Sequence, residues 1–284
     1  MKRTILAIVY AFVLTTAAKA QELIYEKYDS IFIENITTAL SQRKFKDNGK
    51  RIIAIAERFL GQKYVSGTLE NGLTEPLYVS CTKLDCTTFV ELVVAIELAI
   101  EKGSSSFYDV CRELEKVRYR NGVRRGYSSR LHYISWWATD NEKLGILKEV
   151  TKCPHSKDYC LNLSFMSSHK ENYPLLKDNP EIAKAIEELE KPYRNSTSQY
   201  IAKEHLNKGQ NELPIKDGDI VALVTEIEGL DVTHIGFAFW KDEHLHLLHA
   251  SSGKGVVIKD SESLYNYQAN KKSHTGIRVF RMIQ

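Results

Sequence analysis

The first half of the chain carries apolar residues at the three- and four-residue steps that are typical of amphipathic helices. This spacing predicts helical structure over residues 30–60, followed by a break at Gly61 and a loop with short extended pieces. The apolar run LDCTTFVELVVAIELAI, residues 84–100, predicts one long helix. Further helices are predicted over residues 107–118 and 182–191.

The last third of the chain has a different pattern. From Lys216 onward, short runs rich in β-branched and aromatic residues are separated by turns that contain Gly and Asp. These runs predict strands over residues 216–226, 232–240, 244–252, 253–260 and 275–283. Helices followed by a block of strands indicate an α+β fold with an antiparallel sheet, in place of alternating βαβ units. Residues 104–212, which lie between the two halves, predict a long insertion of mostly helix and loop.

The first twenty residues have the layout of a secretory signal peptide. Lys2 and Arg3 precede a short apolar run over residues 5–17, and the small residues of Ala18-Lys19-Ala20 form a cleavage pattern. We therefore predict that residues 21–284 form a single domain, exported across the inner membrane to the periplasm. Since no stretch of the chain reaches the roughly 20 apolar residues of a membrane span, we expect no stable membrane insertion.

The charge balance excludes one broad class of function. The whole chain has 39 Lys+Arg and 36 Asp+Glu, and the predicted signal peptide contains Lys2, Arg3 and Lys19. The mature chain is therefore formally neutral, whereas a nucleic-acid-binding protein usually has a basic excess. Hydrophobic residues at 43% and charged residues at 26% are typical of an ordinary globular protein.

Cys86 lies at the front edge of the predicted helix 84–100. A thiol in this position can be core filling, half of a disulfide, a metal ligand or a nucleophile. The chain has five cysteines, and an odd number in an exported protein leaves at least one unpaired. No two of them have the C-x-x-C spacing of a zinc knuckle. The spacing of Cys153 and Cys160 permits a small disulfide loop, and the sequence leaves that pairing open.

The residues around Cys86 are those of a helix start. Asp85, Thr87 and Thr88 are residue types that cap helices. The unpaired N–H groups and the positive end of the helix dipole would favour the thiolate, and the same N–H groups can hold an oxyanion. The pattern is compatible with a reactive thiol, but most free cysteines are small buried hydrophobes.

A reactive thiol needs a base, and His234 is one candidate among the nine histidines. It precedes the run IGFAF, at the mouth of a predicted strand. Gly236 and Ala238 share its face under two-residue alternation, which would leave room for a neighbouring helix. The alternative is a histidine at the end of a strand, in contact with water.

His249 lies one predicted strand later and shares a face with two leucines, so it is expected to point inward. It could accept the Nδ1 proton of His234 and fix the tautomer of that ring, as the third member of a triad does. The rival interpretation is a metal site formed by the H-x-H-x-x-H run. Strand alternation places His244 and His246 on the opposite face from His249, so we predict neither a metal nor another cofactor.

Five stretches of the chain resemble, in their order, the NlpC/P60 cysteine peptidase superfamily. They are GQKYVSG from Gly61, DCTTFVE from Asp85, DGDIV from Asp217, THIGF from Thr233 and HAS from His249. In that superfamily a loop bearing a tyrosine precedes an Asp-Cys helix start, and a histidine and a polar third residue lie on successive strands. The motifs YVSGTLE, LDCTTFVE and LLHAS most resemble the DUF1460 branch, described as N-acetylmuramoyl-L-alanine amidase-like.

The resemblance implies a papain-like fold that cleaves peptidoglycan peptides. It implies Cys86 as the nucleophile, His234 as the base, His249 as the orienting residue and Tyr64 near the oxyanion site. For this branch it implies hydrolysis of the amide between N-acetylmuramic acid and L-alanine, whereas other members cut between D-glutamate and the diamino acid. The gap from Tyr64 to Cys86 and the insertion over residues 104–212 depart from the superfamily pattern, which leaves the cleaved bond open.

Several residues are candidates for substrate contact. Arg130 could pair with a substrate carboxylate in bidentate geometry, and Glu70 and Thr68 follow the tyrosine loop closely. Trp136 could stack on a sugar or peptide, although adjacent tryptophans are more often core residues.

The expected partners are peptidoglycan muropeptides, with no nucleic acid, and the expected state is a monomer. An endopeptidase that cuts deeper in the stem peptide and an inactive cell-wall binding protein are the two alternatives. The endopeptidase would use the same nucleophile on a different bond. The presence of Cys86, His234 and His249 together argues against an inactive protein, in which any one of them could have been replaced.

Overall fold

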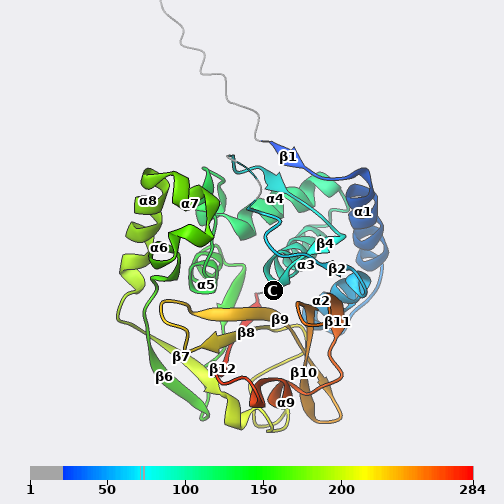
Figure 1. The fold of residues 1–284 in the computed structure, drawn as a ribbon. Coiled ribbons are helices and arrows are strands. Elements are labelled where there is room, and N and C mark those ends of the chain that lie inside the picture. Colours follow the sequence, from blue (N-terminus) through cyan, green and yellow to red (C-terminus); the bar gives the residue numbers. More distant parts are fainter. Residues whose placement is uncertain (1–21, 71, 73, 284) are drawn as a thin grey trace, which may run out of the picture.

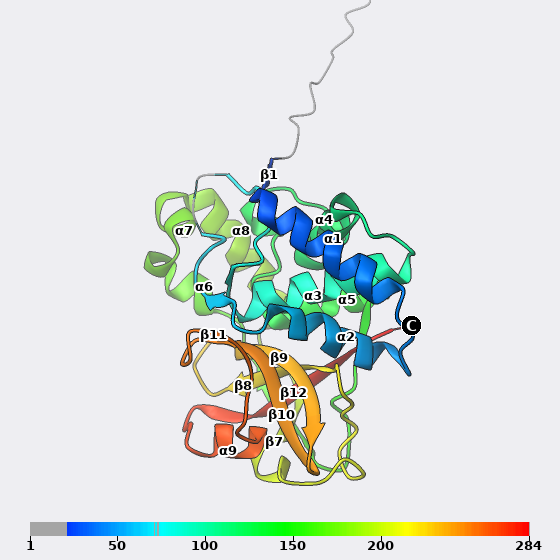
Figure 2. The same cartoon turned by 90° about the vertical axis from the view of Figure 1, so that its right-hand side faces the viewer.

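A layer of helices packs against one face of a large sheet (Figures 1 and 2). The computed structural model describes residues 22–70, 72 and 74–283, and the predicted signal peptide lies outside these residues. No helix in the described part of the chain has the length and apolarity needed to cross a bilayer.

The helical layer is built around α3, Cys86–Glu101, which is the predicted helix 84–100 and is buried over most of its length. The helices packed with it are α1, Lys27–Ser41; α2, Asn48–Ala56; and α4, Phe107–Arg118, while α5, Ile134–Lys143, packs on α4 and β5. The region predicted as helical over residues 30–60 therefore contains two helices. A new helix starts after Asp47 because its carboxylate accepts a hydrogen bond from the Lys50 N–H at 2.9 Å.

The sheet is mostly antiparallel, in the order β4-β2-β11-β10-β9-β8-β12-β7-β6, and β5 also pairs with β12. The strands predicted in the last third of the chain are confirmed as β8, Ile220–Thr225; β9, Val232–Lys241; β10, His244–Ser251; β11, Val256–Lys259; and β12, His274–Met282. The loop before α3 supplies β2, Lys63–Tyr64, and β4, Lys83–Leu84; β1, Leu23–Ile24, and β3, Leu77–Tyr78, form a separate parallel pair. Helices packed on a mostly antiparallel sheet agree with the predicted α+β class.

The insertion differs from the prediction of helix and loop alone, because part of it extends the sheet. Its strands are β5, Leu147–Glu149; β6, Ser156–Leu161; and β7, Ser196–Ala202. The polar sequences SKDYCL and STSQYIA of β6 and β7 lack the apolar alternation of a buried strand, which is why they were missed. The helices of this region are α6, Phe165–Ser168; α7, Pro174–Asp178; and α8, Pro180–Glu190. Cys153 and Cys160 are free thiols in the structure.

The two faces of the sheet are covered by different elements. On the helical face, Phe237 of β9 packs edge-on against Phe89 of α3, with ring centroids 5.7 Å apart. On the opposite face, Leu245 and Leu247 of β10 pack with Leu264 of α9, Leu264–Ala269. Residues of β9 and β10 are therefore buried on both sides, and a polar group there needs a partner.

Short 3₁₀ turns lie at Glu57–Phe59, Arg120–Gly122, Tyr127–Ser129, Lys170–Asn172, Lys191–Tyr193 and Lys203–His205.

Candidate active site

Cys86 is the first residue of α3, and the helix starts there because Asp85 and Thr88 cap one another. The Asp85 carboxylate accepts a hydrogen bond from the Thr88 N–H at 2.8 Å, and the Asp85 N–H donates to the Thr88 hydroxyl at 2.9 Å. This capping box satisfies backbone groups that the helix itself cannot. It also fixes the thiol at the positive end of the helix dipole.

Strands β9 and β10 stop pairing beside this thiol. The ladder between β9 and β10 ends with the pair Phe237 and Leu248. Ile235 lies two residues beyond that pair, and its N–H donates a hydrogen bond to Cys86 Sγ. The Thr87 N–H also bonds the sulfur, and the Thr87 hydroxyl lies 4.0 Å from it. These contacts hold the thiol where the ladder between β9 and β10 ends, beside Ile235, which follows His234 in the chain.

His234 of β9 and His249 of β10 meet at the end of the same ladder. His234 Nε2 lies 2.6 Å from His249 Nδ1, and the two side chains are 9% and 0% exposed. The predicted contact runs through Nδ1 of His234, and this detail is wrong. The structure commits Nε2 of His234 to His249, which leaves Nδ1 for a second partner.

Asp260, which the sequence analysis did not single out, extends this row. It directly follows β11, and its Oδ2 lies 3.5 Å from His249 Nε2. The available signal was the GKG turn between two predicted strands, because a hairpin brings its two ends together. The Asp260 N–H indeed donates to the Leu247 carbonyl at 2.9 Å.

The row Asp260–His249–His234 fixes the tautomer of each ring. A carboxylate can only accept hydrogen bonds, so Asp260 selects the tautomer of His249 that carries its proton on Nε2. Nδ1 of His249 is then an acceptor, which places the proton of His234 on Nε2. Nδ1 of His234 is left unprotonated, and such a nitrogen is what a general base requires.

Burial keeps the thiol and both rings neutral. It lowers the pKa of His234 well below its usual value and lowers the pKa of His249 to about 4, although Asp260 opposes the second shift. Burial, and then the Asp85 carboxylate, raise the pKa of Cys86 to about 11. The easily ionised thiol expected from the helix start is therefore absent, because desolvation outweighs the N–H donors.

Tyr64 lies near the thiol. It pairs with Leu84 in the short parallel ladder of β2 and β4, two residues before Cys86. Burial, followed by Cys86 and Asp85, raises the pKa of the Tyr64 phenol to about 12, so the hydroxyl keeps its proton. A protonated phenol here can donate to an oxyanion that forms near the sulfur.

A cavity of about 210 Å³ opens next to the capping box, with Asp85 and Thr87 on one side and Glu70 and Arg130 on the other. Arg130 is 5% exposed. Its Nη2 lies 2.7 Å from Glu70 Oε1, and its Nε lies 3.3 Å from Glu75 Oε1. Two carboxylates thus already neutralise the guanidinium. The cavity presents Arg130 and Glu70 as paired donors and acceptors instead of a bare positive charge.

Two other candidates for substrate contact are buried. Trp136 is fully buried and packs edge-on against Tyr133, with ring centroids 4.8 Å apart, so it occupies the core position that the sequence analysis gave as its alternative. Thr68 is 8% exposed and lies between Gly67 and Leu69, which line the cavity. Neither placement favours the predicted contact.

The other histidines of the H-x-H-x-x-H run do not join His249. His244 is exposed, and His246 stacks on Phe239 with ring centroids 5.3 Å apart. Across residues 22–70, 72 and 74–283, no group of three or more His, Cys, Asp or Glu side chains is arranged to hold a metal ion.

Gly236 allows the two histidines to meet. A Cβ at this position would lie 2.8 Å from His249 Cβ and 2.9 Å from the Leu248 carbonyl oxygen. The prediction that a helix uses this space is wrong, because α3 packs on the face that carries Phe237. The His249 side chain fills this space.

We expect Gly236→Ala to destabilise the fold by about 1–3 kcal/mol, because the methyl group overpacks a closed site. Urea denaturation would measure the change in the free energy of unfolding. Gly253→Ala is the matched control, since a Cβ there has no atom within 4 Å. Equal unfolding free energies for the two variants would show that His249 can move aside at no cost.

Comparisons with known proteins identify the family of the chain. The family model described as AmiA-like, N-acetylmuramoyl-L-alanine amidase-like, matches residues 54–277. The fold is similar to a crystal structure of an N-acetylmuramoyl-L-alanine amidase from Bacteroides uniformis, with 36% identity, a TM-score of 0.78, and coverage of 84% of this chain and 99% of that one. No curated protein sequence matches the chain.

Two further solved structures are similar. A Bacteroides fragilis protein, described as a candidate xylanase, has 41% identity and a TM-score of 0.75, with coverage of 81% of this chain and 100% of that one. A Legionella pneumophila protein described by the family model DUF1460 has 26% identity and a TM-score of 0.67, with coverage of 90% and 94%. From the match over residues 54–277, the chain belongs to the AmiA-like family of N-acetylmuramoyl-L-alanine amidase-like proteins.

Proposed function

We propose that the protein is a cysteine-dependent amidase that hydrolyses the bond between N-acetylmuramic acid and L-alanine in peptidoglycan fragments. The observation that carries this proposal is the thiol of Cys86, which accepts a hydrogen bond from the Ile235 N–H. Ile235 directly follows His234, the first member of the row His234, His249 and Asp260. Family membership and the amidase from Bacteroides uniformis support the amide as the bond attacked.

The proposed reaction uses general-base activation of a neutral thiol. Nδ1 of His234 takes the proton of Cys86 as the sulfur attacks the lactyl carbonyl carbon. The oxyanion that forms accepts hydrogen bonds from the Cys86 N–H and the Tyr64 hydroxyl. The L-alanine amine then leaves with the proton from His234, and water hydrolyses the thioester to free the thiol.

The imidazolium that forms on His234 is stabilised along the row. Its Nε2–H donates to His249, whose own Nε2 lies 3.5 Å from the Asp260 carboxylate. The negative charge of Asp260 thus acts on the base through one intervening ring, as the third member of a triad acts directly. Because all three groups are nearly buried, this charge is poorly screened by water.

The cavity beside Asp85 is the proposed site for the part of the substrate next to the cleaved bond. Arg130 and Glu70 offer a donor and an acceptor 2.7 Å apart, which suits the amide and hydroxyl groups of a muropeptide. A substrate carboxylate would replace Glu70, whose side chain is 29% exposed, as the partner of Arg130. A papain-like NlpC/P60 architecture, export to the periplasm and a monomeric state are part of the same proposal.

Product analysis tests the cleaved bond. The mature protein, Cys86→Ser and Cys160→Ser would each be incubated with a muramoyl tripeptide, and the products identified by mass. We expect N-acetylmuramic acid and the free tripeptide from the wild type and from Cys160→Ser, whose exposed thiol lies away from the site on β6. Cys86→Ser should give no product within detection.

Other products would select the alternatives. Release of the diamino acid alone would replace the proposal with an endopeptidase. Absence of product from the wild-type protein on muramoyl peptides of several lengths would favour a cell-wall binding protein without activity.

The raised pKa of Cys86 predicts slow alkylation at neutral pH. A thiol with a pKa of about 11 is ionised to roughly one part in a thousand at pH 8, so the rate with iodoacetamide should rise about tenfold per pH unit up to pH 10. Peptide mapping would separate Cys86 from the other four cysteines, with N-acetylcysteine as the reference thiol. A rate that is already level at pH 7 would instead reveal a thiolate–imidazolium pair with His234.

Asp260→Asn should lower kcat while KM and the melting temperature stay near their wild-type values. An amide can donate as well as accept, so it no longer forces the tautomer of His249. We expect a loss of order 10–100-fold, the usual effect of removing a group that orients a functional histidine. Asp178→Asn, an exposed change at the end of α7, is the control. An unchanged kcat would remove Asp260 from the row.

A further inference from the structure

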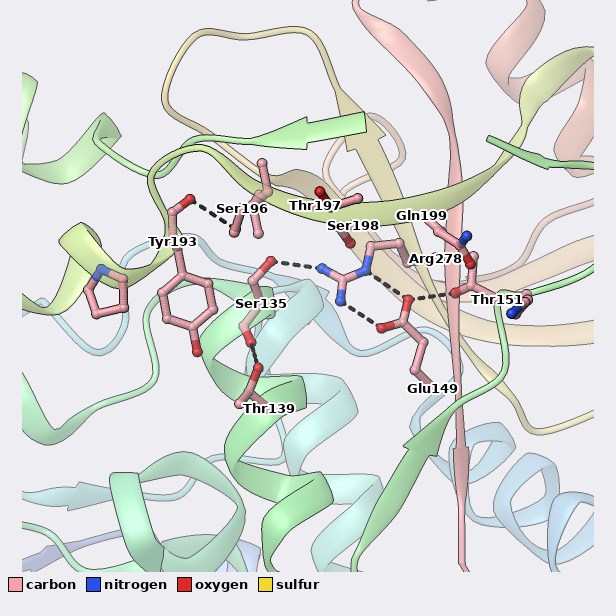
Figure 3. A pocket seen from close by; sticks show the side chains of 13 residues that line it. Ser135, Thr139, Glu149, Thr151, Tyr193, Ser196, Thr197, Ser198, Gln199 and Arg278 are labelled. Carbon is pink, nitrogen blue, oxygen red and sulfur yellow. Dashed lines mark hydrogen bonds and ion pairs between the residues drawn. The ribbon is translucent and has the colours of Figure 1, made fainter. Parts of the chain in front are cut away.

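A second, larger pocket lies beside α5 (Figure 3). Its volume is about 490 Å³, and residues of α5, β5, β7 and β12 line it. Ser135 and Thr139 of α5 line this pocket, whereas Arg130 and Tyr133, just before the same helix, line the first cavity. The two pockets therefore share one short segment of chain in their linings.

The floor of this pocket is a buried network that is already balanced in charge. Arg278 is 5% exposed and reaches both oxygens of Glu149, at 3.0 and 2.9 Å, and the Ser135 hydroxyl, at 2.7 Å. The Ser135 N–H in turn donates to Asp231 at 2.6 Å. Among the described residues these partners use three of the five N–H groups of Arg278, which leaves two for a ligand.

The walls are rich in neutral hydroxyl groups. Figure 3 shows β7 running past Arg278, with Tyr193 beside Ser135. The neutral polar side chains that line the pocket are Ser135, Thr139, Thr151, Ser196, Thr197, Ser198 and Gln199. Tyr193 and Pro192 add two ring faces, so the pocket combines an apolar platform with hydroxyl, carboxylate and guanidinium groups.

The side chains that line the pocket favour one class of ligand over two others. An anion is disfavoured because Glu149 and Asp231 offset the charges of Arg278 and the exposed Lys152. A peptide added as an extra strand is disfavoured because β7 is already paired on both edges, with β6 and with β12. A neutral polyhydroxylated ligand can use the paired donors and acceptors and stack one ring face on Tyr193.

We propose that this pocket is a saccharide-binding site, separate from the cavity beside Asp85, that takes a neutral pair of N-acetylhexosamine units; the choice of this sugar rests on the proposed peptidoglycan substrate. Hydroxyl groups of the sugar would bond the two remaining N–H groups of Arg278 and the side chain of Glu149, which is 30% exposed. The site would hold glycan near the catalytic cavity without taking part in the reaction. Binding here is independent of which bond Cys86 attacks, so the proposed activity and this site can fail separately.

The test is a calorimetric titration of the mature Cys86→Ser protein with chitotetraose, a neutral β-linked N-acetylglucosamine tetramer. We expect Tyr193→Ala to weaken binding at least about fivefold, through loss of the stacking face. Thr197→Trp, at an exposed position on β7, should block the pocket without disturbing the core and decides the question if Tyr193→Ala folds poorly. Lys152→Ala should leave the affinity within about twofold, since a neutral ligand gains little from an exposed charge.

Three results would overturn the proposal. One is chitotetraose binding that neither Tyr193→Ala nor Thr197→Trp changes, and another is no binding at millimolar sugar. The third is a large loss in Lys152→Ala, which would make the pocket an anion site. In protein that keeps Cys86, Tyr193→Ala and Thr197→Trp should each hydrolyse a muramoyl dipeptide at the wild-type rate. A loss of rate equal to the loss of sugar affinity would place the pocket within the catalytic site.

Discussion

The arrangement of the site depends on the point where β9 and β10 cease to pair. A buried backbone N–H must find a partner, and for Ile235 that partner is the sulfur of Cys86. One hydrogen bond thereby joins the start of α3 to the sheet and sets the thiol beside the chain segment that carries His234. Where the ladder ends at Phe237 and Leu248, there is also space for two imidazole rings, which a side chain at Gly236 would close.

Desolvation gives this site its chemical character. The helix start, the N–H donors and the row of histidines would each favour a charged thiol in water, yet burial keeps Cys86 and His234 neutral. Charge separation then belongs to the transition state, where Asp260 can stabilise it. The wall of the adjoining cavity follows the same rule, because Glu91 and Arg118 are buried only as a pair, 2.6 Å apart.

Local patterns in the sequence predicted most of what depends on local structure. The helix at Cys86, the strands of the last third and the inward direction of His249 all follow from periodicity and capping, and the structure contains them. Asp260 was missed because its role arises from pairing across a hairpin, and the alternation within one strand does not reveal it. The pKa of Cys86 was misjudged because the cost of burial depends on the packed tertiary structure. The edge strand β6 and its neighbour β7 are polar over most of their length, so no hydrophobic pattern marks them.

The position of β12 has a consequence for how the chain can fold. This last strand, His274–Met282, lies inside the sheet, with β8 on one edge and β7 and β5 on the other. The strands of the insertion are therefore joined to the rest of the sheet only through the final residues of the chain. Such long-range pairing is slow to form, because the closure entropy is spent before the contacts are gained. The sheet cannot be completed until the C-terminal strand is available, and an unfinished chain would leave two unpaired edges where β12 belongs.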